Sequence, residues 1–341
     1  MKSLFLYYLK KRIPITLIAS FLTLIVFVVI TATNKMGLIN NKSFVTQVSL
    51  VYLGVIPCIF ATVIPIYEFS FKMRRNSIDL FYSLPIKRYK LFLTKYLIGL
   101  IELVVIFSIS YLYVLLFDLI TASANGLTFN SIYFLPAYFV IVGLSILVYS
   151  WFAFVFTRGN TILDGVIYIG LSIFMLTIIY CGVIVIINMF RSPDNVYRIS
   201  NEYDYTPYHL IMTFANYFEG KCISNERKFY AEPFPLWIVG SVSVIFAVLF
   251  FVLNVKKKAE DTSDVSSEWY TYKLLIPVYT LGLYLIVPYT LFYAVLIAIA
   301  AYVGYVIFNR SFKIRIPDLI VMCSCVFAGT AFSIMMMAMY K

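Results

Sequence analysis

Long apolar runs alternate with short polar and basic segments along most of this chain. Six runs each reach the length of about 20 residues that a helix needs to cross a hydrocarbon core of roughly 30 Å. They cover residues 13–32, 45–67, 96–119, 132–156, 163–189 and 236–254. The pattern therefore predicts six membrane-spanning helices within residues 13–254.

A further apolar stretch at 274–308 is too long for a single crossing. As one helix it would measure about 50 Å. Basic residues flank both of its ends, Lys273 before it and Arg310 after it, so the stretch is expected to start and finish on the same side. We expect Pro288 to divide it into two short helices or a re-entrant hairpin.

A last apolar run at 317–340 predicts one more crossing. Residues 274–341 thus form a C-terminal membrane region of about three segments, joined to the first six spans by a cytoplasmic linker at 255–273. Composition agrees: 62% of the residues are hydrophobic and 13% are charged, whereas a soluble domain has about 45–50% and 25%. The sequence predicts an all-α polytopic membrane protein.

Lys and Arg are concentrated in the segments that precede or follow alternate spans. The chain carries a net charge of +11, and its basic residues are densest in 1–12, 67–95 and 255–273. The positive-inside rule places these segments, with the N-terminus, on the cytoplasmic side of the cell membrane, and leaves 190–235 as an extracellular loop. Basic residues spread over membrane flanks also argue against nucleic acid as a partner.

The loop at 67–95 is the most informative cytoplasmic segment. It mixes basic residues with large apolar ones, which suits a short amphipathic helix at the membrane surface that ends at Pro85. A basic loop that only fixes the topology would have the same composition. The residues alone leave both interpretations open.

Three strings in and after this loop resemble the permease subunits of type-2 ABC exporters. They are RRNSIDL at 74–80, SLPIKR at 83–88 and KYLIGL at 95–100. In that family a similar string forms the coupling helix, which docks on the ATP-binding subunit. By this resemblance the ATPase-coupling residues are Ser77, Ile78, Asp79, Leu80, Ser83, Leu84, Pro85 and Arg88.

The layout of the chain also resembles this family, in particular a bacterial branch with an extra C-terminal membrane region. Family members have a six-span core, an amphipathic N-terminal helix, here 1–12, and a long insertion between spans five and six, here 190–235. The resemblance implies a dimer of permease chains, identical or different, that exports an amphipathic or hydrophobic substrate such as a peptide or lipid.

Nucleotide chemistry is expected in a separate subunit. The chain contains no G-x-x-x-x-G-K-[ST] phosphate loop, so ATP would be bound by the partner and this chain would need no cofactor. It also has no H-E-x-x-H or G-x-S-x-G motif, and helical spacing points Cys323 and Cys325 to different faces. We therefore predict a transport subunit that is not itself an enzyme.

Two other functions stay open on the sequence: a secondary transporter or channel without an ATPase, and a non-transporting sensor or immunity protein. Glu102 is the deepest acidic residue in a predicted span, two helical turns beyond Lys95. It is expected either to pair with a cation or snorkel to the membrane surface, or to contribute to gating. Because no predicted span has an acid at its centre, a proton relay is less well supported.

Overall fold

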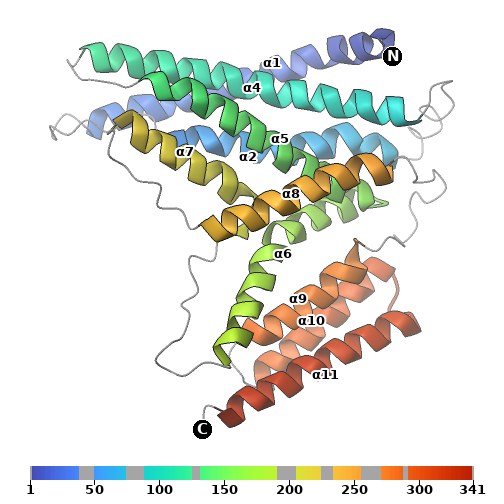
Figure 1. Cartoon of the computed structure of the whole chain (residues 1–341). Helices are drawn as coiled ribbons and strands as arrows, with labels where there is room; N and C mark the ends of the chain where they lie inside the picture. Colours follow the sequence, from blue (N-terminus) through green and yellow to red (C-terminus); the bar gives the residue numbers. More distant parts are fainter. Residues whose placement is uncertain are drawn as a thin grey trace. The chain divides into compact units, whose positions relative to one another are not determined.

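The computed structural model describes residues 2–37, 50–73, 88–124, 131–189, 205–223, 233–254, 270–286 and 291–339. Helices account for most of these residues, and no strand occurs among them (Figure 1). The α-helices are α1 (Lys2–Gly37), α2 (Leu50–Phe69), α4 (Arg88–Ala124), α5 (Phe134–Arg158), α6 (Ile162–Met189), α7 (Pro207–Ile223), α8 (Pro233–Asn254), α9 (Tyr272–Ile286), α10 (Leu291–Asn309) and α11 (Ile316–Met339). Two short 3-10 helices are η1 (Ser70–Met73) and η2 (Ser131–Tyr133).

Seven of the described helices are long and apolar enough to cross a membrane, namely α1, α2, α4, α5, α6, α8 and α10. The predicted runs at 13–32, 96–119, 163–189 and 236–254 lie within α1, α4, α6 and α8, while α2 and α5 contain the runs at 45–67 and 132–156 only from Leu50 and Phe134 onward. Helices α9 and α11 contribute shorter apolar segments. The structure therefore confirms a polytopic helical membrane protein.

The long apolar stretch at 274–308 is divided, as expected. Helix α9 ends at Ile286 and α10 begins at Leu291, and Pro288 lies between them, outside the described residues. With 15 residues, α9 measures about 22 Å at 1.5 Å per residue. That is shorter than the hydrocarbon core, and α9 is covered by its neighbours: the hydroxyl of Tyr284 donates to the Ala294 carbonyl oxygen of α10 at 2.8 Å.

The described residues form two compact units. The first holds α1, α2, α4, α5 as far as Phe154, α7 and α8, and the second holds α6, α9, α10 and α11. The fifth predicted span is thus grouped with the C-terminal helices rather than with the other five. Helices α6 and α9 pack closely within the second unit: a Cβ atom on Gly282 would lie 2.0 Å from Cγ2 of Ile178.

In the first unit, α1 and α4 are long helices that lie against each other, and α2 packs on α4 and on α7 (Figure 1). Helix α1 is continuous from Lys2 to Gly37, so the predicted surface helix at 1–12 and the first predicted span at 13–32 are one helix. Pro14 lies inside it without ending it, which membrane helices tolerate when neighbours or local adjustments satisfy the freed backbone groups.

Aromatic side chains fill the contact between α5 and α8. The ring of Phe246 on α8 lies 4.9 Å from the Trp151 ring and 5.2 Å from the Phe154 ring, between centroids. Both α5 side chains are fully buried. Rings at such separations add attraction beyond the area that they bury, so these contacts stabilise the packing of α8 on α5.

The segment predicted as an extracellular loop contains a helix, α7. It runs antiparallel to α2, because Tyr208 at its start bonds Thr62 within α2 while Glu219 near its end reaches Val51 at the start of α2. The Tyr208 and Thr62 hydroxyls are 2.7 Å apart, and Oε2 of Glu219 accepts the Val51 N–H at 3.4 Å. Glu219 thereby satisfies one of the N–H groups that a helix start leaves free.

Candidate functional site

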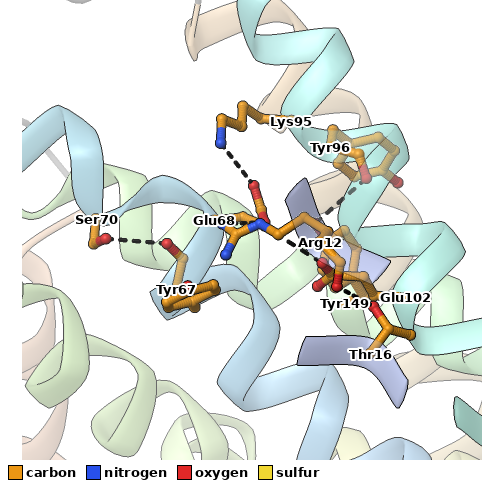
Figure 2. A network of polar contacts seen from close by, with 9 residues as sticks. All are labelled: Arg12, Thr16, Tyr67, Glu68, Ser70, Lys95, Tyr96, Glu102 and Tyr149. Carbon is orange, nitrogen blue, oxygen red and sulfur yellow. Dashed lines mark hydrogen bonds and ion pairs between the residues drawn. The ribbon is translucent and has the colours of Figure 1, made fainter. Parts of the chain in front are cut away.

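Four charged side chains meet inside the first unit, where α1, α2 and α4 come together (Figure 2). Arg12 comes from α1, Glu68 from the last turn of α2, and Lys95 and Glu102 from α4. Lys95 and Glu102 are seven residues apart, so they lie two turns apart on one face of α4. We call these four residues the charge cluster.

Glu68 occupies the middle of the charge cluster. Its carboxylate contacts the Arg12 guanidinium through one oxygen and lies 3.2 Å from Nζ of Lys95 through the other. A longer contact of 3.7 Å joins Nε of Arg12 to Oε1 of Glu102. Cations and carboxylates therefore alternate, and two positive charges balance two negative ones.

The charge cluster is shielded from solvent. The Glu68 side chain is 0% exposed, and those of Lys95, Glu102 and Arg12 are 6%, 7% and 11% exposed. A charge within a membrane span is costly, and such residues are rare, paired with one another and tied to function. The energetic cost of each charge explains why the cluster is neutral as a whole.

Tyrosine rings cover both cations. The Arg12 guanidinium carbon lies 3.9 Å from the centre of the Tyr67 ring, and Nζ of Lys95 lies 4.1 Å from the centre of the Tyr8 ring. The negative face of an aromatic ring attracts a cation, most strongly where water is excluded. These rings stabilise the two positive charges within an otherwise apolar setting.

Helix α5 is joined to α4 directly beside the charge cluster. Tyr149 donates its hydroxyl to the Tyr96 carbonyl oxygen at 3.4 Å, and the Tyr96 and Ser150 hydroxyls are 2.6 Å apart. Gly99 makes room for this contact, since a Cβ atom there would lie 2.3 Å from the Tyr149 hydroxyl. Helix α5 thereby packs on α4 next to the charge cluster, whose own residues come from α1, α2 and α4.

Polar residues continue from the charge cluster along the face of α1 that meets α4. Four hydroxyl residues lie on one side of α1, because they are three, four or eight residues apart: Thr16, Ser20, Thr23 and Thr31. The Ser110 hydroxyl on α4 donates to Oγ1 of Thr23 at 3.0 Å, and Thr31 lies 3.2 Å from the Tyr113 hydroxyl. Each such bond stabilises membrane helices by about 0.6 kcal/mol on average.

The predicted ATPase-coupling residues lie almost wholly outside the described part of the chain. Ser77, Ile78, Asp79, Leu80, Ser83, Leu84 and Pro85 are not described, and Arg88 is the first residue of α4. The loop that contains them is nevertheless bracketed by the charge cluster: Glu68 precedes it on α2, and Lys95 follows it on α4.

Glu102 is paired, which was one of its expected roles. Its partner is Arg12 rather than Lys95, because Lys95 turns to Glu68. Glu68 was not predicted as a site residue, because it was counted with the polar loop although α2 extends through Phe69. A signal was available in α1, where Arg12 lies in register with the polar face of Thr16, Ser20 and Thr23.

Comparison of this chain with family models, with curated proteins and with solved structures finds no match. Within the residues that the structure describes, no group of three or more His, Cys, Asp or Glu side chains is placed to hold a metal ion. The charge cluster and the loop that it brackets are therefore the candidate functional site of this chain.

Proposed function

We propose that this chain is the membrane permease subunit of an ATP-driven ABC exporter in the cell membrane. In this proposal a separate subunit binds and hydrolyses ATP, a second permease chain completes the pathway, and the N-terminus is cytoplasmic. The observation that carries the proposal is the position of the charge cluster. It joins the two helices that flank the candidate coupling loop, through Glu68 and Lys95, and adds α1 through Arg12.

This arrangement suits mechanical coupling. A partner that pushes on residues 77–88 would act on the ends of α2 and α4, and the ion pairs would pass the displacement to α1. Arg12 lies between two carboxylates, in contact with Glu68 and 3.7 Å from Glu102. A shift of α1 relative to α2 would let Arg12 exchange one carboxylate for the other, which gives Glu102 a gating role with two discrete arrangements.

The substrate class follows from the resemblance and from the apolar setting. An amphipathic or hydrophobic molecule, such as a peptide or a lipid, would be moved between or along spans whose exposed side chains are mostly apolar. The chain would supply the pathway and the coupling, and the partner would supply the free energy of ATP hydrolysis.

Purification of the tagged chain from its native membranes tests the proposal. We expect an ATP-binding subunit to purify with the wild-type chain and to be lost when Asp79, Leu80 and Leu84 are changed to alanine. Changing Phe312 and Lys313 to alanine is the control, because this exposed turn between α10 and α11 is predicted to face the same side of the membrane. A well-folded wild-type chain that recovers no ATP-binding protein would contradict the proposal.

A secondary transporter is the second candidate, and Glu68 is the observation that favours it. Buried carboxylates in membrane spans commonly mark ion or proton pathways. Such a carrier would transport in proteoliposomes that contain this chain alone, driven by an ion gradient. An exporter subunit would be inactive there until the ATP-binding partner and ATP were added.

A further inference from the structure

An apolar groove of about 430 Å³ lies between α1 and α2 in the first unit. Leu22, Val26 and Ile30 line it from α1, on a face next to the polar one that meets α4. Tyr52, Val55 and Ile59 line it from α2. The hydroxyl of Thr23, at the edge of the groove, is hydrogen-bonded to Ser110 and to the Ser20 carbonyl oxygen of its own helix. It therefore needs no hydrogen-bond partner from a bound molecule.

The groove lies in one half of the membrane span. From Ala19 to Ile30 it extends along about 16 Å of α1 at 1.5 Å per residue. That length is close to half of a hydrocarbon core of roughly 30 Å. On both helices the lining residues lie toward the end that is remote from Arg12 and Glu68, so the groove faces the leaflet far from the charge cluster.

The volume of the groove suits a fatty acyl chain. An apolar cavity of about 150 Å³ accepts benzene, which has six carbons. The groove is almost three times as large at about 430 Å³, which corresponds to on the order of 17 carbons by the same measure. The volume of the groove and its extent of about half a hydrocarbon core therefore both suit one acyl chain.

Another membrane helix is a poor occupant. Helices associate in membranes through small residues that let their backbones approach, whereas the groove is lined mainly by large side chains. The small residue of α2 in this region, Gly54, already serves a different contact, because a Cβ atom there would lie 3.4 Å from Cβ of Ala215 on α7. A flexible hydrocarbon chain can follow such walls where a helix would be held away.

We propose that the α1–α2 groove binds one acyl chain of a bilayer lipid from the leaflet remote from Arg12. Tyr52 lies at the start of α2 and is 49% exposed, a position where tyrosine anchors at the headgroup level. The lipid headgroup would lie beside it. This inference requires membrane insertion only, so it stands independently of the ATP-coupled function.

Photolabelling tests the acyl-chain site. The full chain is reconstituted in phosphatidylcholine vesicles that contain a phosphatidylcholine with a diazirine on one acyl chain, and labelled residues are located by mass spectrometry. We expect severalfold more label at Val26 and Ile59 than at Val29 and Val63, which have similar exposure but do not line the groove. Even labelling of all four positions would overturn the proposal and show bulk lipid contact only.

A matched pair of variants gives a second readout. Val26→Trp fills the groove, whereas Val29→Trp places the same side chain on the same helix outside it; both valines are 55% exposed. Label at Ile59 should be lost in the first variant and retained in the second. Equal labelling of Ile59 in the two variants would overturn the proposal. So would a dimer of this chain that Val26→Trp dissociates and Val29→Trp does not, because the groove would then hold a second copy of the chain. The wild-type labelling pattern remains decisive if Val26→Trp fails to fold.

Discussion

Replacing Glu68 by glutamine should destabilise the first unit more than neutralising Glu102, the other carboxylate of the charge cluster. The substitution keeps the shape of the side chain but leaves Arg12 and Lys95 without the carboxylate between them. Only Glu102 would then oppose two buried cations, at 3.7 Å from Arg12. Removing one partner of a buried ion pair typically costs about 3–5 kcal/mol.

The comparison with Glu102→Gln makes this prediction specific. Glu102 makes the longer contact, and Arg12 keeps Glu68 when Glu102 is neutralised, so we expect a loss of about 1–2 kcal/mol. On the scale of about 2–4 °C per kcal/mol for domains of 150–250 residues, Glu68→Gln should lower the melting temperature by roughly 6–20 °C. Glu102→Gln should lower it by roughly 2–8 °C.

Thermal unfolding of the purified chain in lipid nanodiscs provides the measurement. The double variant Glu68→Gln/Lys95→Gln serves as the internal control, because it leaves one cation and one carboxylate. Its loss should be smaller than the sum of the single losses, with a coupling of about 0.5–3 kcal/mol. Additive losses, or equal effects of Glu68→Gln and Glu102→Gln, would refute the central place of Glu68.

Two further predictions concern helix contacts of the first unit. Gly99→Ala should lower the stability of the first unit by about 1–3 kcal/mol, because the fully buried Tyr149 ring must move. Gly143→Ala is the control: no atom lies within 4 Å of a Cβ atom at Gly143, so this variant should be neutral or slightly stabilising in the same melting assay. Tyr208→Phe should free α7 from Thr62 at a cost of about 0.6 kcal/mol and increase hydrogen exchange in α7; unchanged exchange would show that the hydroxyl pair does not hold this helix.

The apolar runs predict the long helices well because the length and composition of a run decide whether its helix could cross a membrane. The runs at 96–119 and 163–189, for example, fall within α4 and α6. The division near Pro288 was predictable for a similar reason, since no helix of that length fits one crossing. These features are local and require no knowledge of neighbouring helices.

Partner choice among helices was not predictable from such runs. Helix α6 has the same apolar character as the other long helices, and its packing on α9 includes a close fit of Gly282 against Ile178 that hydropathy does not reveal. Helix α7 was missed because its 17 residues include His209, Glu219 and Lys221, which give a loop-like composition. Its helical form is supported by contact with α2, a feature that hydropathy does not report.

The charge cluster could be predicted only in part from the sequence. Pairing was one of the roles expected for Glu102, and the structure places it 3.7 Å from Arg12. Its partner comes from α1, distant in sequence, and Glu68 was placed in a loop because a charged residue at the end of an apolar run is usually solvated. Only the meeting of three helices makes these four residues one site.

The most direct test of the account is whether ATP moves α1 relative to α4. Spin labels at Ile13 and Tyr89, both exposed and close in sequence to the charge cluster, would report that distance by double electron–electron resonance in a chain without its native cysteines. In the complex with its ATP-binding subunit, the account predicts a distance distribution that shifts when ATP is added, and no shift with Asp79, Leu80 and Leu84 changed to alanine. An identical distribution with and without ATP in the intact complex would contradict it.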